Sequence, residues 1–257
     1  MHDTFDYREK NNVERNDFVS LLLNLKDTLS KEELAADGML VFAGGFESSS
    51  SLMSFTLYEL ALNQDIQEKL REEILQEIEG NDGKLTYELL NNLKYLDMVT
   101  KEVLRKHPPL PDNQRECTKD FQVPGSNFTI TEGTIVNVSF YSLHHDAEYF
   151  PDPYKFDPER FNDENVKNIK PFTYLPFGEG PRWVNFIIFW SFLINFEIFR
   201  ICIGMRFGLM QAKLAIVKLL MNFKFLPCPR TTIPMKIVPA GPFMTPVDGI
   251  YLNVEKI

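Results

Sequence analysis

The sequence predicts a mainly α-helical chain with small β-sheets, an α+β fold. Residues 31–62 and 203–223 form long runs that are mostly apolar or small, a pattern typical of helices that pack in a core. Residues 121–138 instead contain short runs rich in β-branched and aromatic residues, separated by turn residues, which predicts a small sheet. At 257 residues, the chain is long enough to bury one substantial core.

Charge and cysteine content exclude several classes of protein. The net charge of −9 argues against binding to nucleic acid, which requires a basic surface. The three cysteines, Cys117, Cys202 and Cys228, are odd in number and far apart, so a disulfide framework or a paired-cysteine zinc site is not expected and a reducing compartment fits better. The first 17 residues are polar, so neither a signal peptide nor an N-terminal membrane anchor is expected there.

The N-terminal part of the chain predicts two helices. Asn16-Asp17 would cap the first, at residues 18–25, and the second would extend over about 31–62, with its apolar middle buried. In that middle, Gly44-Gly45 costs about 1 kcal/mol per glycine relative to alanine. One interpretation is close helix–helix packing at the glycines. The other is that the Ser48 hydroxyl bonds the Gly44 carbonyl and opens the helix locally, leaving room for a small ligand to which Glu47 and Ser48 could relay protons.

Two further helices are predicted before the sheet. Residues 64–78 are charged and amphipathic, and a solvated face is expected to carry Glu68, Lys69, Arg71 and Glu72. Thr86 is expected to cap the next short helical segment. A helix at about 94–106 should stop before Pro108-Pro109.

Residues beyond the predicted sheet contain a histidine pair and a β-rich tail. His144 and His145 are adjacent, so their side chains point apart, and no third ligand is evident; a surface loop or helix end is therefore favoured over a metal site. Residues 233–238 and 249–254 are β-like runs separated by turn residues.

Two segments near residue 200 carry the strongest functional motif. Phe177-Gly-Glu-Gly-Pro-Arg182 and Ile201-Cys-Ile-Gly204 lie on either side of residues 183–200, and together they read FGEGPRICIG. A glycine-rich turn that brings one cysteine to a helix start suits a haem-thiolate site, because glycines allow close approach and the helix N-terminus favours the thiolate. The joined segments resemble the haem-binding signature of the cytochrome P-450 monooxygenases, Phe-x-x-Gly-x-Arg-x-Cys-x-Gly, most of all the insect microsomal, xenobiotic-metabolising type.

Other motifs of that family occur in the expected order. Gly44-Gly-Phe-Glu-Ser48 is similar to the oxygen-activation motif Ala/Gly-Gly-x-Glu/Asp-Thr, with serine in place of threonine. Glu102 and Arg105 resemble the Glu-x-x-Arg pair, and Pro158-Glu-Arg-Phe161 resembles the loop that locks it. The resemblance implies that Glu102, Arg105 and Arg160 form a buried structural network.

The resemblance also implies roles for individual residues. Cys202 would be the axial ligand of the haem iron, and Glu47 and Ser48 would relay protons. The remaining haem contacts would be Arg115 and Arg182 at the propionates, Phe177 beside the sulfur, and Gly204 in the loop. The candidate substrate contacts are Phe42, Phe46, Asn113 and Thr245, the last near the tip of a C-terminal hairpin at Met244–Pro246.

The implied function is insertion of one oxygen atom of O2 into small apolar substrates, either xenobiotics or endogenous lipophilic compounds. It requires haem b (iron protoporphyrin IX) and NADPH-derived electrons from NADPH-cytochrome reductase or a cytochrome b-type donor. The implied location is the cytosolic face of the endoplasmic reticulum membrane. The resemblance covers the C-terminal half of a family member, so residues 1–257 would form a partial domain without the family's anchor.

Residues 183–200, WVNFIIFWSFLINFEIFR, interrupt the haem loop at 177–204 and admit three interpretations. A membrane helix has nearly the required length of about 20 residues but contains several polar residues. A loop insertion this apolar would promote aggregation. A translated intron is favoured, because its removal could regenerate one arginine from Arg182 and Arg200 and leave the signature intact. The competing functional hypothesis is therefore a truncated or mis-spliced chain that binds no haem; a helical binding module without cofactor is a third.

Overall fold

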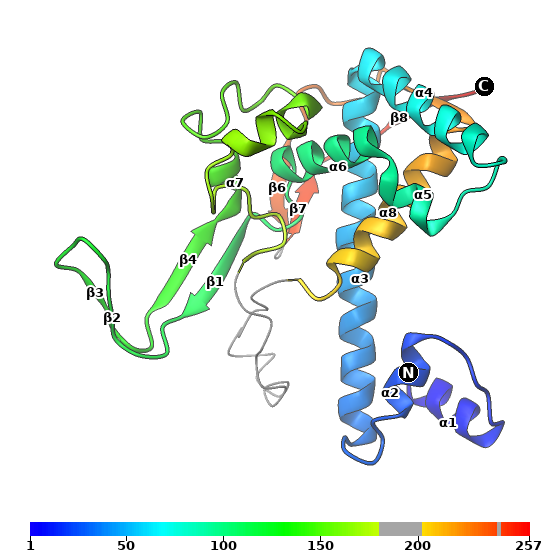
Figure 1. The fold of residues 1–257 in the computed structure, drawn as a ribbon. Helices are drawn as coiled ribbons and strands as arrows, with labels where there is room; N and C mark the ends of the chain where they lie inside the picture. Colours follow the sequence, from blue (N-terminus) through cyan, green and yellow to red (C-terminus); the bar gives the residue numbers. More distant parts are fainter. Residues whose placement is uncertain (180–201, 241–242) are drawn as a thin grey trace.

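The computed structural model describes residues 1–179, 202–240 and 243–257 (Figure 1). Helices make up most of the regular structure, and the strands form small antiparallel pairs, so the predicted α+β class is confirmed. The helices are α1 (His2–Lys10), α2 (Phe18–Leu23), α3 (Lys31–Leu62), α4 (Gln64–Gly80), α5 (Tyr87–Asn92), α6 (Lys94–Lys106), α7 (Phe140–His144) and α8 (Met205–Leu220), with 3-10 turns at Pro158–Phe161 and Asn165–Asn168.

Local signals explain where several helices begin. Asp17 accepts a hydrogen bond from the Ser20 amide and Thr86 accepts one from the Leu89 amide, which confirms both predicted caps. α3 begins with a capping box in which Ser30 and Glu33 bond each other's backbone amides. Its bounds are the same as those of the predicted helix. The helix α1 was not expected from its polar sequence; it is held by Arg8, whose guanidinium bonds the Asp17 carboxylate at 2.6 Å and 2.7 Å.

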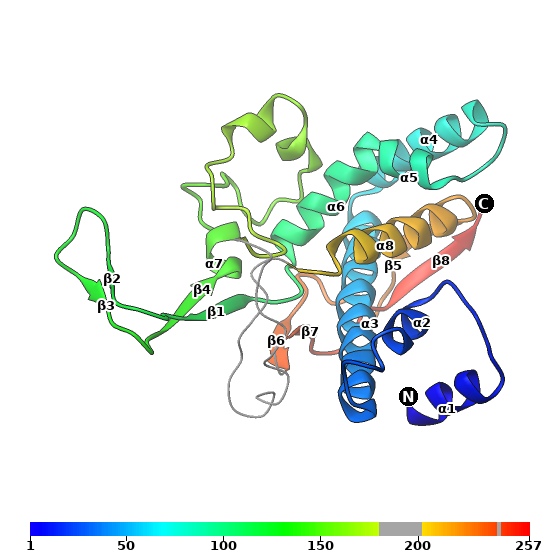
Figure 2. The same ribbon diagram turned by 60° about the horizontal axis from the view of Figure 1, so that its bottom comes forward.

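α3 is the axis around which the chain is arranged (Figure 1). α1 and α2 pack at its N-terminal end through a small cluster formed by Phe5, Leu22, Leu34 and Ala35. α4, α5, α6 and α8 surround its C-terminal half, as Figure 2 shows from a second direction. The main core lies there; it contains Phe55 of α3, Leu96 of α6 and Ile216 of α8, all buried.

The middle of α3 corrects the prediction of a helix buried along its length. Phe42 and Phe46 are 68% and 59% exposed, and a Cβ added to Gly44 or Gly45 would meet no atom within 4 Å. Close packing at the glycine pair is therefore ruled out among the described residues. Helical periodicity reports only that a face is apolar, and here no element of the described chain covers this face.

α4 corrects a second prediction, since one of its charged residues is not solvated. Arg71 is buried, and its guanidinium donates to the carbonyls of Leu220 and Phe223, each at 3.0 Å. These carbonyls belong to the last residue of α8 and the first residue of the strand that follows it, so Arg71 ties α4 to a segment about 150 residues away in sequence. Its neighbours Glu68, Lys69 and Glu72 are exposed, as predicted.

The strands pair in four antiparallel two-stranded sheets among the described residues. β1 (Asp112–Glu116) pairs with β4 (Ile135–Ser139), and β2 (Phe121–Gln122) pairs with β3 (Thr129–Ile130) to prolong the same arm of the molecule (Figure 1). β5 (Phe223–Pro227) pairs with β8 (Leu252–Lys256), and β6 (Ile237–Ala240) pairs with β7 (Phe243–Pro246). Met244–Pro246 thus lies within β7, close to the end of the hairpin at which Ala240 pairs with Phe243.

Within the described parts of the chain, no helix is both long enough and apolar enough to span a bilayer.

Candidate functional site

The two halves of the interrupted glycine-rich motif meet in the structure. The Cys202 amide donates a hydrogen bond to the Phe177 carbonyl at 3.0 Å. In the sequence the two residues are separated by a stretch that includes residues 180–201, which lie outside the described part of the chain. The Phe177 ring is half-buried and packs against the main core. Arg182 and the insertion at 183–200 lie outside the described residues.

Cys202 stands at the entrance to α8. Gly204 is the N-cap of this helix, so the thiol lies just before its first turn. Cys202 is exposed overall, yet burial of its sulfur raises the pKa of the thiol, and hydrogen bonds from the backbone of Gly204 and Met205 oppose this only in part. A helix N-terminus by itself favours the thiolate, but in the structure desolvation has the larger effect on the thiol pKa.

The serine of the second motif makes the predicted contact without the predicted opening. The Ser48 hydroxyl donates to the Gly44 carbonyl at 2.6 Å, but α3 is an unbroken helix across both residues. The space beside the motif comes instead from the two glycines, which leave one side of the helix without side chains. Glu47 is exposed.

α3 and α8 bring this motif and the cysteine segment together. A Cβ on Gly208 would lie 3.5 Å from the Ser49 hydroxyl, so the first turns of α8 pack beside the turn that contains Ser48. Exposed apolar side chains flank this contact on both helices. On α3, Phe42 and Phe46 stack with ring centroids 6.3 Å apart; before and within α8, Ile203 and Phe207 are exposed.

The residues present on this side suit a flat, apolar cofactor. A single sulfur donor stands at a helix start, glycines give close access to the helix backbone, and exposed aromatic rings lie beside it. Among the described residues, no group of three His, Cys, Asp or Glu side chains could hold a metal ion by itself. The chemistry of a single thiolate, as Cys202 could offer, suits one ligand position of a metal carried by a cofactor.

Glu102, Arg105 and Arg160 lie together, as the sequence motifs suggest. The Arg105 guanidinium bonds both carboxylate oxygens of Glu102, at 2.7 Å and 2.8 Å, and both side chains are 0% exposed. Arg160 Nε lies 3.5 Å from the same carboxylate, and Arg160 Nη2 donates to the Asp152 carbonyl at 2.9 Å. The Asp157 amide also donates to Glu102, at 3.0 Å, so the carboxylate is held by backbone as well as by side chains.

The other predicted site residues lie on the strands. Asn113 and Arg115 are half-buried on β1, and the guanidinium donates to the Asn113 amide oxygen and to the Gln114 carbonyl. Thr245 is exposed on β7, which reaches the end of α6 through a bond from the Met244 amide to the Pro109 carbonyl at 3.0 Å. The structure thus places β7 beside the segment that follows α6.

His144 was expected at a surface, and the structure corrects this. It ends α7 as a helix-end position should, but it is 0% exposed, and its Nε2 accepts a hydrogen bond from the Leu175 amide at 2.9 Å. Its carbonyl accepts from Arg105 at 2.7 Å. No local signal identifies this role, because two adjacent histidines look alike in sequence and only His145 remains partly exposed.

Burial, together with the nearby Arg105 guanidinium, lowers the pKa of His144 from its ordinary value of 6.5 to about 3. Between these values the unfolded chain binds a proton that the folded protein does not, so the free energy of unfolding should fall as the pH falls, by about 1.4 kcal/mol per pH unit. We expect His144→Gln to flatten this slope by that amount between about pH 6.5 and pH 5. Denaturant titrations at a series of pH values measure it; His145 titrates in both proteins and cancels. Equal slopes would contradict the assignment.

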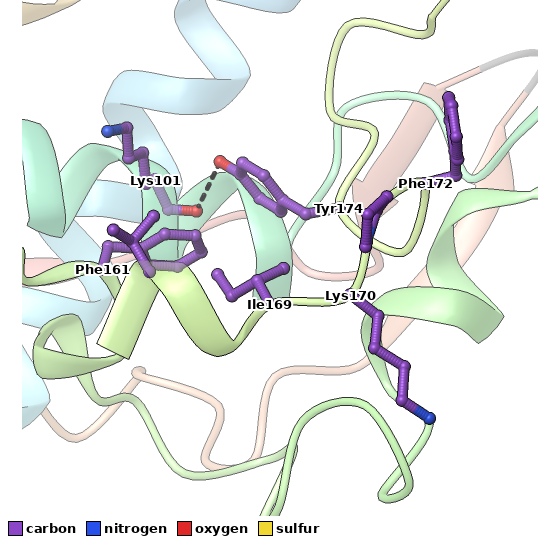
Figure 3. A pocket seen from close by; sticks show the side chains of 8 residues that line it. Lys101, Phe161, Ile169, Lys170, Phe172 and Tyr174 are labelled. Atoms are coloured by element: carbon purple, nitrogen blue, oxygen red, sulfur yellow. Dashed lines mark hydrogen bonds between the residues drawn. The ribbon is translucent and has the colours of Figure 1, made fainter. Parts of the chain in front are cut away.

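A shallow pocket lies beside this region, between α6 and the segment that follows the 3-10 turns (Figure 3). Phe161, Ile169, Phe172 and Tyr174 contribute apolar walls, whereas the ammonium groups of Lys101 and Lys170 point away from it in Figure 3. None of the predicted site residues is among those that line it. It is therefore separate from the candidate site.

Comparison with known proteins gives a consistent result. The family model described as Cytochrome P450 matches residues 1–183 and 199–254, and the unmatched stretch falls inside the predicted insertion. The chain is similar to the probable cytochrome P450 6a13 of Drosophila melanogaster, with 44% identity over 260 residues that cover 99% of this chain and 49% of the relative. It is also similar to cytochrome P450 9e2 of Blattella germanica, with 41% identity over 276 residues that cover 100% of this chain and 48% of the relative. The chain spans about half the length of the curated relatives it matches.

Proposed function

The chain belongs to the cytochrome P450 family. From this membership we propose that the protein that contains this chain is a haem-thiolate monooxygenase. One observation carries the proposal. Cys202 stands at the start of α8 with its amide bonded to the Phe177 carbonyl, so the motif on both sides of the insertion converges on one thiol. The glycine pair and the exposed aromatic residues of α3 lie on the helix that packs against α8, near the contact of Gly208 with Ser49.

Each residue of the site has a definite part in this proposal. A haem iron with a thiolate ligand supplies O2 activation, in which one oxygen atom enters the substrate and the other leaves as water. Cys202 would hold that iron, and Gly204 would keep the backbone of the loop close to it. Arg115, and Arg182 outside the described residues, would neutralise the propionates of haem b.

The α3 motif would handle protons and substrate. The Ser48 hydroxyl, held by the Gly44 carbonyl at 2.6 Å, would carry a proton inward from the exposed Glu47 carboxylate. Phe42 and Phe46 would offer an apolar surface to a lipophilic substrate, a xenobiotic or an endogenous compound. Asn113 and Thr245 are further proposed contacts, from β1 and β7 respectively.

The proposal also includes the electron supply and the location. NADPH-cytochrome reductase, or a cytochrome b-type donor, would deliver electrons that originate from NADPH. The protein would act at the cytosolic face of the endoplasmic reticulum membrane. Both statements rest on membership of the family.

A second candidate, a chain that binds no haem, is supported by the insertion. The family match breaks off at residue 183 and resumes at residue 199, between Arg182 and Cys202, where a ligand loop depends on its surrounding geometry. Sequencing the transcript across codons 182–201 tests its origin: absence of the insertion from mature message identifies it as unspliced intron.

The spectrum of the purified protein tests the function. The protein is expressed from its complete coding sequence, with and without residues 183–200, and reconstituted with haem. We expect the shortened protein to show a thiolate-type Soret band and a matching ferrous carbon monoxide spectrum. If the protein with the insertion shows no such spectrum, the second candidate holds for that product. If neither protein shows it, the proposed function is wrong.

A further inference from the structure

The segment from Thr173 to Gly178 contacts the cysteine loop, by which we mean the described residues 202–204, through one backbone hydrogen bond. Its Phe177 carbonyl accepts the hydrogen bond from the Cys202 amide at 3.0 Å, so its position sets where that amide can lie. A turn closed by the Gly178 amide on the Leu175 carbonyl, at 3.1 Å, connects this contact to the preceding residues. Whatever holds Leu175 therefore also helps to place Cys202.

Two hydrogen bonds attach this segment to the rest of the protein. The Tyr174 hydroxyl donates to the Lys101 carbonyl in α6 at 3.0 Å, as the dashed line in Figure 3 shows. The Leu175 amide donates to Nε2 of His144 at 2.9 Å. Lys101 immediately precedes Glu102, so the first bond already links the segment to the helix that carries the buried ion pair.

His144 links the same two parts through both its backbone and its ring. Its carbonyl accepts from Arg105 Nη1 at 2.7 Å, and its ring lies against Phe140, Phe150 and Tyr174. Because Nε2 accepts a hydrogen bond, the neutral ring must carry its proton on Nδ1. This Nδ1–H group has no hydrogen-bond partner among the described residues. The buried, unpartnered Nδ1 costs desolvation free energy, and the hydrogen bond accepted by Nε2 opposes this cost.

We propose that His144 is a positioning residue for the haem-thiolate site: it joins the Glu102–Arg105 pair to the cysteine loop through the Leu175 amide. The functional consequence, correct placement of Cys202 as a haem ligand, rests on the proposed function. The hydrogen bonds that connect His144 to the loop do not depend on it. The continuous path runs from Arg105 to the His144 carbonyl, from the His144 ring to Leu175, and from Phe177 to Cys202.

The test compares three variants in the full-length protein. His144→Phe keeps an aromatic ring of similar size but has no acceptor for the Leu175 amide. His144→Gln restores an acceptor oxygen near the position of Nε2. His145→Phe is the matched control: His145 is the next residue, its ring stacks on Tyr141 at 4.1 Å, and its Nδ1 bonds the Tyr141 carbonyl, away from the cysteine loop.

Amide hydrogen exchange in peptides that cover residues 173–178 is the first measurement. We expect His144→Phe to accelerate exchange there by roughly tenfold, the factor that corresponds to loss of one buried hydrogen bond, while peptides from α4 stay unchanged. His144→Gln should recover most of the protection, and His145→Phe should match the parent protein. The second measurement is the ferrous carbon monoxide spectrum, in which His144→Phe should lower the thiolate-type fraction.

Three results would overturn the inference. They are unchanged exchange at residues 173–178 in His144→Phe, equal acceleration in α4 (which would indicate a general loss of stability), and the same effect from His145→Phe. If the parent protein shows no haem spectrum, the proposed function fails, but the exchange measurement still decides whether His144 holds the loop.

Discussion

Replacing Cys202 by serine is expected to abolish the thiolate-type spectrum and the monooxygenase activity. A serine side chain is similar in size to that of cysteine, and the substitution leaves the backbone unchanged. The amide of residue 202 can therefore still donate to the Phe177 carbonyl. The hydroxyl is not a soft ligand, and no other cysteine lies near the start of α8 in the sequence. The loss should exceed the roughly 10–100-fold effect that is typical of residues one step removed from a metal. Carbon monoxide difference spectra and turnover of a lipophilic probe substrate measure it.

The chain supplies matched controls for this experiment. Cys117 and Cys228 are half-buried thiols on other elements; Cys117 donates to the Lys119 carbonyl, and Cys228 lies beside Thr231. Cys117→Ser and Cys228→Ser should each leave the spectrum intact. A thiolate-type spectrum that survives in Cys202→Ser and disappears in either control would show that the wrong cysteine has been assigned.

Replacing Glu102 by glutamine should destabilise the protein by about 3–5 kcal/mol. The Arg105 guanidinium, 0% exposed, would lose the carboxylate that it contacts at 2.7 Å and 2.8 Å, and a buried cation without its counter-charge is costly. Arg160, whose Nε lies 3.5 Å from the same carboxylate, would lose this counter-charge as well, whereas the Asp157 amide could still donate to the glutamine oxygen. Denaturant titration of the variant measures the change in the free energy of unfolding.

A surface ion pair on the same helix provides the comparison. Lys101 and Asp97 lie 2.7 Å apart, but their side chains are 39% and 37% exposed. Lys101→Gln should therefore cost no more than about 0.5 kcal/mol. If the two substitutions destabilise the protein equally, burial does not govern the strength of these pairs, and the network around Glu102 has no special structural part.

Features written in neighbouring residues could be predicted from sequence. The caps at Asp17 and Thr86 depend on side chains only three residues from the amides they bond. The bond from Ser48 to the Gly44 carbonyl follows from helical geometry in the same way. The Glu102–Arg105 pair lies one helical turn apart, so it too has a local signature. These signals identify helices, their starts and short-range contacts.

Features that depend on what packs against a residue could not. Phe42 and Phe46 have the pattern of a buried face, yet they are exposed, because burial requires a second surface that periodicity does not reveal. Arg71 is predicted on a solvated face, yet it is buried against carbonyls at the end of α8 and the start of β5. The sequence pattern predicts that a charged residue on an amphipathic helix is exposed. It cannot reveal a backbone acceptor that is distant in sequence and close in the fold.

The sequence by itself determined the family and the fold class, because both rest on residue types at short spacings, and on the same basis it predicts Cys202 as the thiolate ligand. Only the tertiary structure decided which of two adjacent histidines is buried and where it donates or accepts. The bond between His144 and the Leu175 amide spans 31 residues, and the bond between the Phe177 carbonyl and the Cys202 amide crosses the insertion. Both form because packing of α6, α7 and α8 brings the groups into contact, and buried polar groups must find partners wherever the fold places them.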